Sequence, residues 1–221
     1  MATIRPETII KGMHRQMKWD GCVPTFTGLS FNVLDPKPEA VVFDDVVQGL
    51  AYKFRFGGLI GPITVAEHCI MVSRIIEILW PKSGAVMPGL LHDSCEAYTH
   101  DIQSPVRSHI RVQLGNGELI TWGDLERLLN TAVSKALWDG MDFYTYPEVQ
   151  AADMLAAAIE KSCIASVKDE DWGLPPIPAA IAHLKSEFLS PAAAHRAFTL
   201  RYEEVINGEI KAGRVGHLAE Q

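Results

Sequence analysis

The chain has 221 residues, of which 48% are hydrophobic, and a formal net charge of −7. This length allows one large domain or two small ones, and the apolar fraction is sufficient for a complete core. The acidic balance argues against a duplex DNA or RNA partner, because binding to a phosphate backbone relies on clustered Lys and Arg. It does not exclude a small anionic substrate held by a metal ion and one or two arginines.

The first part of the chain is polar and lacks a strong period. Met1–Lys18 is interpreted as a loose arm or docking segment, and Gly21–Pro38, with Gly and Pro between short β-prone pieces, predicts a small hairpin. The first helix is expected to begin near Asp44 or Asp45, both good N-caps, and to stop at the paired glycines that follow Phe56. Its predicted buried stripe consists of Val46, Val47, Leu50, Ala51 and Phe54.

The second helix opens with Thr64-x-x-Glu67, the pattern of a capping box, so Glu67 is interpreted as structural. Apolar residues follow at alternating spacings of four and three, which predicts one buried face. A third helix is expected to begin at Ser83 or Met87 and to give way to a loop at Asp101. After a turn at residues 115–117, the sequence predicts helices over Thr121–Asp139, Pro147 to about Val167, Ala179–Leu189 and Pro191–Asn207.

In the predicted helix at Thr121–Asp139, Leu128 is placed on the apolar face. The last predicted helix is expected to be capped by Ser190 and to stop at Gly208. No repeat or long linker interrupts the pattern. We therefore expect a single all-α domain. It would have an arm and hairpin at residues 1–40, a core at 41–170 and C-terminal helices at 171–221.

Cysteine use and apolar segments indicate the compartment. The four cysteines, Cys22, Cys69, Cys95 and Cys163, show no CxxC spacing, and two of them lie in apolar helical runs, which predicts small buried side chains in a reducing cytoplasm. The N-terminus lacks the apolar core of a signal peptide. The longest apolar region, Leu59–Trp80, contains charged residues and should not span a membrane. A cytoplasmic protein is expected.

The stretch Leu90–Arg107 carries the densest polar pattern in the chain. Residues three and four apart share a helix face, so Glu96 is expected beside His92 and Asp93. An imidazole beside a carboxylate suits a metal ion, and a second carboxylate one turn on is well placed to handle a proton. The pattern alone is also compatible with a surface pair of charges.

Two more polar residues lie within strongly apolar helical runs, where an unpaired charge would be costly. These are His68, in TVAEHCIMVS, and Asp153, in AADMLAAAIE. A core histidine bonded to a carbonyl would also explain His68, and an interhelical salt bridge would explain Asp153.

The order of His68, His92-Asp93 and Asp153 resembles that of the HD-domain metal-dependent phosphohydrolases. More narrowly, the segments YKFRFGG, ITVAEH and LLHDSCEAYTHDIQSPVR are similar to the deoxynucleotidase branch found in bacteria and their phages. The resemblance covers roughly Phe26 to Lys161. It implies an HD-domain helical bundle and one divalent ion, such as Co, Mn, Zn, Ni or Fe, held by these four residues. Such an ion polarises a phosphoryl oxygen and lowers the pKa of bound water.

The same resemblance assigns roles to residues around the metal. Glu96 and Asp101 match the acids expected to protonate the leaving oxygen and to orient the attacking water. Arg55 matches the arginine that grips the phosphate, and Phe56 a bulky aromatic that leaves no room for a 2′-hydroxyl. Taken singly, each acid could be a solvated helix-end charge and Arg55 a surface arginine.

Ser104 and Arg107 match a hydroxyl and a basic residue on the phosphate side of the pocket. Arg107 stands where some relatives have Lys, which could favour a longer phosphate chain. Leu59 stands where many phage relatives carry a histidine, so the exact substrate and leaving group stay open.

The implied activity is removal of phosphate from 5′-deoxynucleoside monophosphates. The alternatives are release of triphosphate from a deoxynucleoside triphosphate such as dATP, with added Mg, then a phosphodiesterase acting on cyclic nucleotides or dinucleotides, then a non-catalytic nucleotide-binding module. The expected partner is a small deoxynucleotide rather than a nucleic-acid polymer or a membrane. Relatives of this kind form dimers or larger rings, which implies a homo-oligomer.

Overall fold

The computed structural model describes residues 21–211, so the arm predicted at Met1–Lys18 lies outside the described part. Within it the chain is mainly helical, as predicted, with two short hairpins. The α-helices are α2 (Phe43–Ala51), α3 (Val65–Leu79), α4 (Val86–Leu91), α5 (Glu96–Thr99), α6 (Ser104–Arg107), α7 (Trp122–Leu137), α8 (Pro147–Cys163) and α9 (Pro191–Lys211). Four short 3-10 turns are η1 (Pro38–Ala40), η2 (Arg55–Gly58), η3 (Phe143–Thr145) and η4 (Ala179–Ile181).

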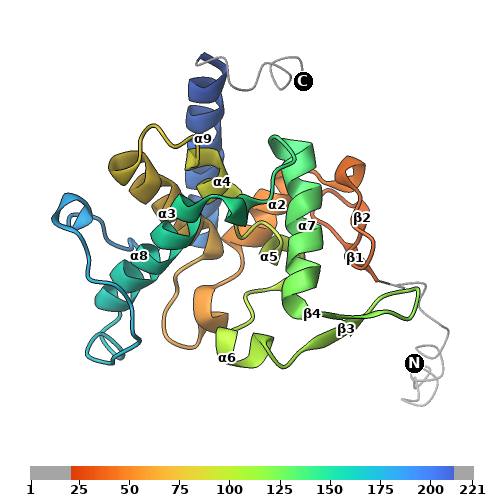
Figure 1. The fold of residues 1–221 in the computed structure, drawn as a ribbon, viewed down its shortest axis with the longest axis horizontal. Helices are drawn as coiled ribbons and strands as arrows, with labels where there is room; N and C mark the ends of the chain where they lie inside the picture. Colours follow the sequence, from red (N-terminus) through yellow and green to blue (C-terminus); the bar gives the residue numbers. More distant parts are fainter. Residues whose placement is uncertain (1–20, 212–221) are drawn as a thin grey trace, which may run out of the picture.

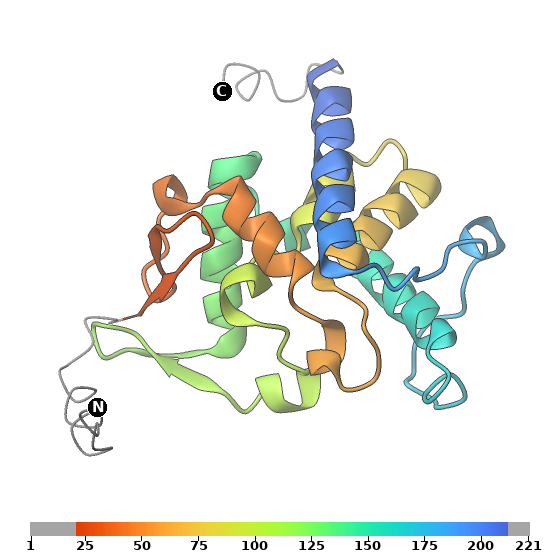
Figure 2. The ribbon, with the colours of Figure 1, turned by 180° about the vertical axis from the view of Figure 1, so that it is seen from behind.

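The hairpins are antiparallel. β1 (Cys22–Pro24) pairs with β2 (Ser30–Asn32), as expected for the region Gly21–Pro38. β3 (Arg111–Gln113) pairs with β4 (Leu119–Thr121) around the turn predicted at residues 115–117. The β1–β2 hairpin lies at the edge of the molecule beside α7 (Figure 1), and the view from behind shows the same arrangement (Figure 2).

Helix α3 occupies the middle of the helical packing and contacts α2, α4, α8 and α9. Its buried face separates two apolar clusters, one shared with α2, α4 and α9 and the other with α8. Close contact with α4 depends on Gly89, because a Cβ atom there would collide with the Ile76 side chain. A larger residue at this position would push α4, which ends next to His92, away from α3, which carries His68.

The first helix differs from the prediction at both ends. It starts at Phe43 without a side-chain cap, and Asp45 instead accepts hydrogen bonds from the amide and hydroxyl of Thr27. It ends at Ala51 rather than at the paired glycines, so Phe54 is not on the helix. The reason is backbone pairing with the chain ahead of α3. The amide of Arg55 donates to the carbonyl of Ile63, and residues 53–55 and 63–65 form a short bridge.

Glu67 is structural, but not as part of a reciprocal cap. Thr64 caps α3 by accepting a hydrogen bond from the Glu67 amide, as predicted. The Glu67 carboxylate points elsewhere and accepts three backbone N–H groups, from residues Glu187, Phe188 and Leu189. These amides would otherwise continue a helix, so the predicted helix at Ala179–Leu189 is wrong and only η4 forms there.

The third predicted helix is interrupted between α4 and α5. Residues 92–95 form a tight turn in which the Glu96 amide bonds to the Asp93 carbonyl, three residues back. The Asn130 side chain on α7 bonds to two backbone groups at this break. Its amide nitrogen donates to the His92 carbonyl and its oxygen accepts from the Cys95 amide, at 2.7 and 2.9 Å. In a regular helix both groups would be used within the helix.

The remaining helices form with shifted ends. Thr121 and Asp124 make a capping box at the start of α7, but Leu128 is 42% exposed and so lies outside its buried face. α8 stops at Cys163, before the predicted Val167, while α9 continues past Gly208 to Lys211. Ser190 does cap α9, by accepting a hydrogen bond from the Ala193 amide.

Cys69 and Cys95 are buried thiols, as expected. In the described range, no helix has both the length and the apolar composition that a membrane span requires.

Candidate metal centre

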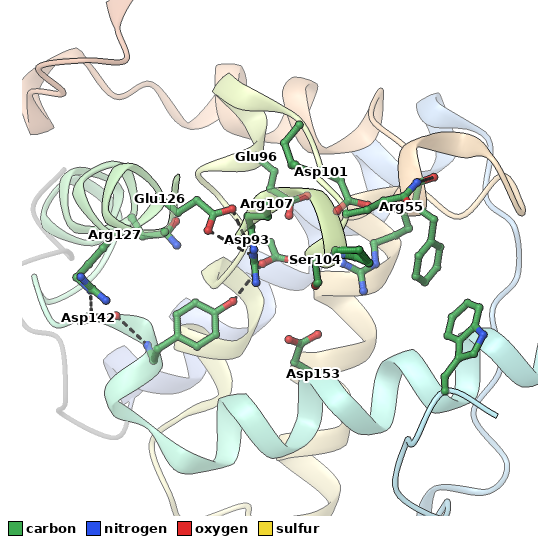
Figure 3. Close-up of a pocket in the computed structure, with 18 residues that line it drawn as sticks. Arg55, Asp93, Glu96, Asp101, Ser104, Arg107, Glu126, Arg127, Asp142 and Asp153 are labelled. Carbon is green, nitrogen blue, oxygen red and sulfur yellow. Dashed lines mark hydrogen bonds and ion pairs between the residues drawn. The ribbon is translucent and has the colours of Figure 1, made fainter. Parts of the chain in front are cut away.

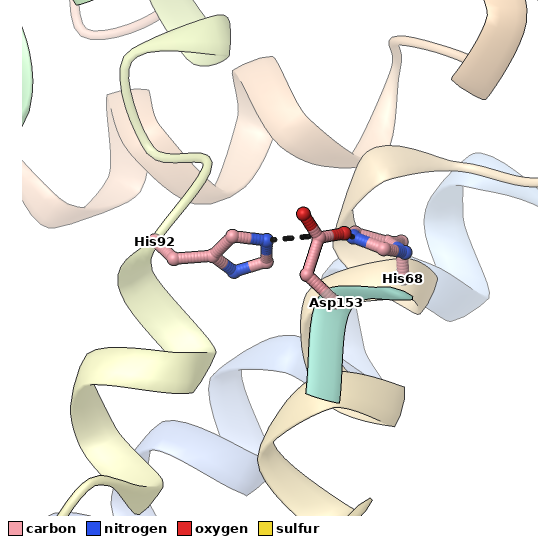
Figure 4. A group of neighbouring side chains, drawn as sticks. All are labelled: His68, His92 and Asp153. Atoms are coloured by element: carbon pink, nitrogen blue, oxygen red, sulfur yellow. Dashed lines mark ion pairs between the residues drawn. The ribbon is translucent and has the colours of Figure 1, made fainter. Parts of the chain in front are cut away.

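Three helices bring four predicted ligands together. Nε2 of His68, on α3, lies 3.1 Å from Oδ1 of Asp153, on α8, and Nε2 of His92, at the end of α4, lies 4.0 Å from the same oxygen. Figure 4 shows the two rings on either side of the Asp153 carboxylate. Oδ2 of Asp93 lies 3.3 Å from Nε2 of His92 and 3.6 Å from Nε2 of His68.

Hydrogen bonds on the far side of each ring fix which nitrogen faces this centre. Nδ1 of His92 lies 2.9 Å from the Gly89 carbonyl, and Nδ1 of His68 lies 2.7 Å from Oε1 of Glu160. Because a carbonyl or carboxylate only accepts, each Nδ1 carries the proton, and in the neutral ring Nε2 presents a lone pair. Metal-ligating histidines are held in this way by a carbonyl or carboxylate behind the ring.

The donor atoms fit a divalent ion. Among the described residues, both Nε2 atoms are buried and make no hydrogen bond, although carboxylate oxygens lie close to them. The ligand atoms of His68, His92 and Asp153 lie close enough to one another that they could hold one metal ion. Two imidazole nitrogens and two carboxylates suit a transition ion and leave positions open for water and substrate.

The electrostatics of the centre also favour a cation. Burial and the charge of Arg55 oppose protonation of His68, but Glu160 and Asp153 outweigh them and raise the pKa of His68 to about 10. Burial alone would raise the pKa of Asp153, yet the neighbouring histidines hold it well below its usual range. Without a metal ion, Glu160 and Asp153 therefore favour the protonated form of His68. A divalent ion bound beside these residues would supply the positive charge instead.

Arg55 is a largely buried residue of this centre rather than a surface arginine. Only 12% of its side chain is exposed, and its guanidinium lies 3.6 Å from Oδ2 of Asp93 and 3.5 Å from Oε2 of Glu160. Burial opposes its charge, but Glu160 and Asp93 more than compensate, so the pKa of Arg55 is raised. A fixed guanidinium fork beside the candidate ligands is well suited to hold phosphate oxygens.

Phe56 follows Arg55 in a left-handed backbone conformation, with φ 56° and ψ 28°, which is uncommon for a bulky residue. Its amide donates to the Asp101 carboxylate, and its carbonyl accepts from the Gln103 side chain at 2.9 Å. Asp101, predicted to orient water, therefore also fixes the backbone of Phe56. Residues held in such conformations cluster at functional sites.

Glu96 is buried, which excludes a solvated helix-end charge. Burial raises its pKa well above the usual range, and the nearby carboxylates of Asp93 and Asp101 raise it further. A carboxyl group whose pKa is raised holds its proton to higher pH, which suits a proton donor. The interruption between α4 and α5 does not remove Glu96 from the centre, since it lines the same pocket as Asp93 and Asp153.

Arg55, Asp93, Glu96 and Asp153 line a pocket of about 740 Å³. Its wall includes all the predicted substrate-binding residues, namely Arg55, Phe56, Ser104 and Arg107. Figure 3 shows Asp93 and Asp153 in the middle of the pocket, with Ser104 and Arg107 on neighbouring α6. Nη1 of Arg107 lies 3.3 Å from Oε2 of Glu126 on α7, so this arginine is held in place by a carboxylate.

Sequence reasoning missed several residues of the centre. Glu160 lies seven positions after Asp153 on α8, so the two are almost two helical turns apart on one face, and this spacing was a usable signal. Tyr144, whose hydroxyl donates to Oδ1 of Asp93 at 3.3 Å, and Trp172, which lines the pocket, come from irregular segments without such a pattern.

Comparison with known proteins gives relatives but no family. No family model matches the chain. An uncharacterized protein of Rhodobacter capsulatus is 26% identical over 191 residues, which cover 81% of this chain and 93% of that protein. The uncharacterized protein YfdR of Escherichia coli K12 is 29% identical over 86 residues, which cover 38% of this chain and 46% of YfdR. Neither name states an activity.

Proposed function

We propose that this protein is an HD-type, metal-dependent phosphohydrolase that removes phosphate from 5′-deoxynucleoside monophosphates. The observation that carries the proposal is the convergence of two hydrogen-bond-free histidine nitrogens with Asp93 and Asp153, directly beside the largely buried Arg55. The adjoining pocket has a volume within the range of roughly 300–1,000 Å³ that is typical of small-molecule sites.

Each polar group has a task in this reaction. A divalent ion would be held by His68, His92, Asp93 and Asp153, and would supply Lewis-acid polarisation of the phosphate and activation of water. Arg55 would bind the phosphate oxygens, because its guanidinium lies beside Asp93, one of the proposed metal ligands. The raised pKa of Glu96 favours its protonated form, and this residue would deliver a proton to the leaving 5′-oxygen.

A second candidate is release of triphosphate from a deoxynucleoside triphosphate. Two arginines in the pocket wall favour it. Arg107 lies 3.3 Å from Glu126 and Arg127 lies 3.8 Å from Asp142, and the remaining donors of both can meet a phosphate chain. Phosphodiesterase activity and a purely binding role lack an observation of this kind.

The decisive experiment measures phosphate and triphosphate release from deoxy- and ribonucleotides, with Co, Mn, Zn, Ni, Fe and Mg added singly. The proposal predicts phosphate release from deoxynucleoside monophosphates by the wild type and none by His92→Ala. Triphosphate as the product would select the second candidate. Binding of nucleotides without any turnover, in protein shown to contain metal, would overturn both.

The sugar preference is part of this proposal. Phe56 is expected to contact the 2′ carbon, so deoxynucleotides should be preferred over ribonucleotides by up to about a hundredfold. Phe56→Ala should narrow the preference for the deoxy sugar. Equal kcat/KM values for AMP and dAMP in the wild type would contradict the assigned role of Phe56.

We also propose that the protein forms a homo-oligomer, which light scattering of the purified protein would test.

A further inference from the structure

The pocket has two chemically different ends. At one end, α7 and the segment before α8 contribute charged groups, including Arg127 and Asp142. Figure 3 shows these two residues on one side of Asp153 and Arg55 on the other. Beyond Arg55 the wall becomes aromatic. The Arg55 guanidinium lies 5.2 Å from the centre of the Phe56 ring, and the Phe56 ring lies 5.5 Å from that of Trp172.

Trp172 is presented by a braced segment. It lies in the connection between α8 and η4, where Nζ of Lys161 donates to the Lys168 carbonyl at 2.8 Å. The same ammonium group lies 5.9 Å from the centre of the Trp172 ring. Next to the ring, the Gly173 amide donates to Asp171 at 2.8 Å, in a turn that requires a positive φ of 65° at Gly173. These contacts fix the ring at the pocket wall.

The indole of Trp172 is nevertheless 37% exposed. Phe56 meets it at an interplanar angle of 64°, which is an edge contact rather than a parallel stack. Tyr144, the other aromatic residue of the wall, is engaged differently. Its hydroxyl donates to Asp93 and its ring packs on His92. Tyr144 is itself 39% exposed, but its ring faces His92 and its hydroxyl faces Asp93, whereas Phe56 and Trp172 pair with each other and form the aromatic end of the pocket.

We propose that Trp172 is the stacking platform for the nucleobase, with Phe56 between the base site and the phosphate site. The inference rests on the proposed function and specifies how the substrate lies in the pocket. With the phosphate at Arg55 and the metal ligands, the sugar reaches Phe56 and the base reaches Trp172. The ligand class at this end is a planar, uncharged heterocycle, because the two rings offer π surface and no formal charge.

The test compares substrates with and without a base. The wild type, Trp172→Ala and Trp172→Phe are assayed on dAMP, dCMP and 2-deoxyribose 5-phosphate, which has no base. Stacking on an aromatic side chain corresponds to about a 5- to 150-fold effect on binding. Trp172→Ala should lower kcat/KM by that factor for dAMP, by less for the smaller base of dCMP, and not at all for 2-deoxyribose 5-phosphate. Trp172→Phe should retain most of the activity on dAMP.

Tyr52→Ala is the matched control, because Tyr52 is an exposed aromatic residue that does not line this pocket. It should behave as the wild type with all three substrates. Equal losses on dAMP and on 2-deoxyribose 5-phosphate in Trp172→Ala would overturn the inference, as would no loss on either.

A binding measurement separates this inference from the proposed reaction. Deoxyadenosine, which has a base but no phosphate, is titrated into wild type and Trp172→Ala by calorimetry. Weaker binding in the variant supports the base site even when no nucleotide is hydrolysed. Identical binding, or none to the wild type, overturns the base site while leaving phosphate release to be judged by its own assay.

Discussion

His92 contributes Nε2 to the candidate metal centre and is fixed from behind by the Gly89 carbonyl. We expect the wild type to bind about one divalent ion per chain. His92→Ala removes a ligand and should lower the metal content to near zero under the same conditions. Metal analysis of both proteins provides the measurement. His183→Ala, at an exposed histidine far along the chain, is the control and should retain the ion.

Equal metal content in wild type and His92→Ala would rule out this ligand set. In that case the buried nitrogen atoms would need another explanation, such as protonation balanced by Asp153.

Glu96 separates metal binding from chemistry, because it lines the pocket but belongs to neither group of side chains that could hold a metal ion. Glu96→Gln keeps the size of the side chain and removes its proton. Turnover should fall by about 10²–10⁴-fold, with metal content and KM little changed. Steady-state kinetics on samples of known metal content would show this. Glu118→Gln, in the exposed β3–β4 turn, should retain full activity.

The pH profile offers an independent readout of Glu96. Its pKa is raised by burial and by Asp93 and Asp101, and a proton donor must be protonated to act. Activity that depends on this proton is therefore present below the raised pKa and lost as the pH rises through it. Glu96→Gln should abolish this alkaline decline in whatever activity remains. A metal-replete variant with normal turnover would show that Glu96 is not the donor.

Individual residues were the most predictable part of the centre. His68 and Asp153 stood out because charged or polar groups in apolar helices need a partner, and the structure supplies one for each. Glu160 and Arg55 show the limit of this reasoning. Their mutual contact depends on how α8 meets the segment before α3, which no local pattern specifies.

At the scale of elements, Asn130 connects α7 to the turn that carries His92 and Asp93. Asn130→Ala would leave the buried His92 carbonyl and Cys95 amide without partners, at a cost of about 2–4 kcal/mol in the free energy of unfolding. Metal affinity should fall as well, because the turn positions two ligands. Urea unfolding and metal titration measure the two effects.

Asn207→Ala provides the comparison, since the Asn207 side chain is exposed and bonds only to a carbonyl of its own helix. It should change stability by no more than about 0.5 kcal/mol. If Asn130→Ala changed the free energy of unfolding as little as Asn207→Ala, the conformation of the turn at residues 92–95 would have to be determined by the sequence of the turn itself.

Periodicity predicted the helices α2, α3, α7, α8 and α9, but it did not predict where helices end, and it predicted one helix, at Ala179–Leu189, that does not form. The ends of α2 and α4 and the absence of a helix before α9 share one cause. Backbone groups that would extend a helix are taken by distant partners: the chain at residues 63–65, the Asn130 side chain and the Glu67 carboxylate. Such partners become neighbours only in the folded molecule, so a local pattern carries no sign of them.

For the whole molecule, the ligand set joins α3, the end of α4 and α8. A ligand that binds only the folded state stabilises it by about 2.7 kcal/mol at a concentration one hundred times its Kd. Removing the metal with a chelator should therefore lower the Tm by about 5–10 °C for a chain of this size. Differential scanning calorimetry with and without chelator measures the shift, and added metal should reverse it.

His92→Ala again serves as the comparison, because a protein that binds no metal should not respond to the chelator. An unchanged Tm in the wild type after verified metal removal would show that the three helices are held together without help from the ion.

The tie between Glu67 and residues 187–189 has a consequence for synthesis on the ribosome. Glu67 immediately precedes His68, and its partner Leu189 follows 122 positions later. Since a chain emerges from its N-terminus, His68, His92 and Asp93 leave the exit tunnel well before Asp153 and the segment that fastens the start of α3. The nascent protein therefore exposes His68, His92 and Asp93 before Asp153 has emerged, and the complete candidate centre can close only when nearly all of the described chain has been made.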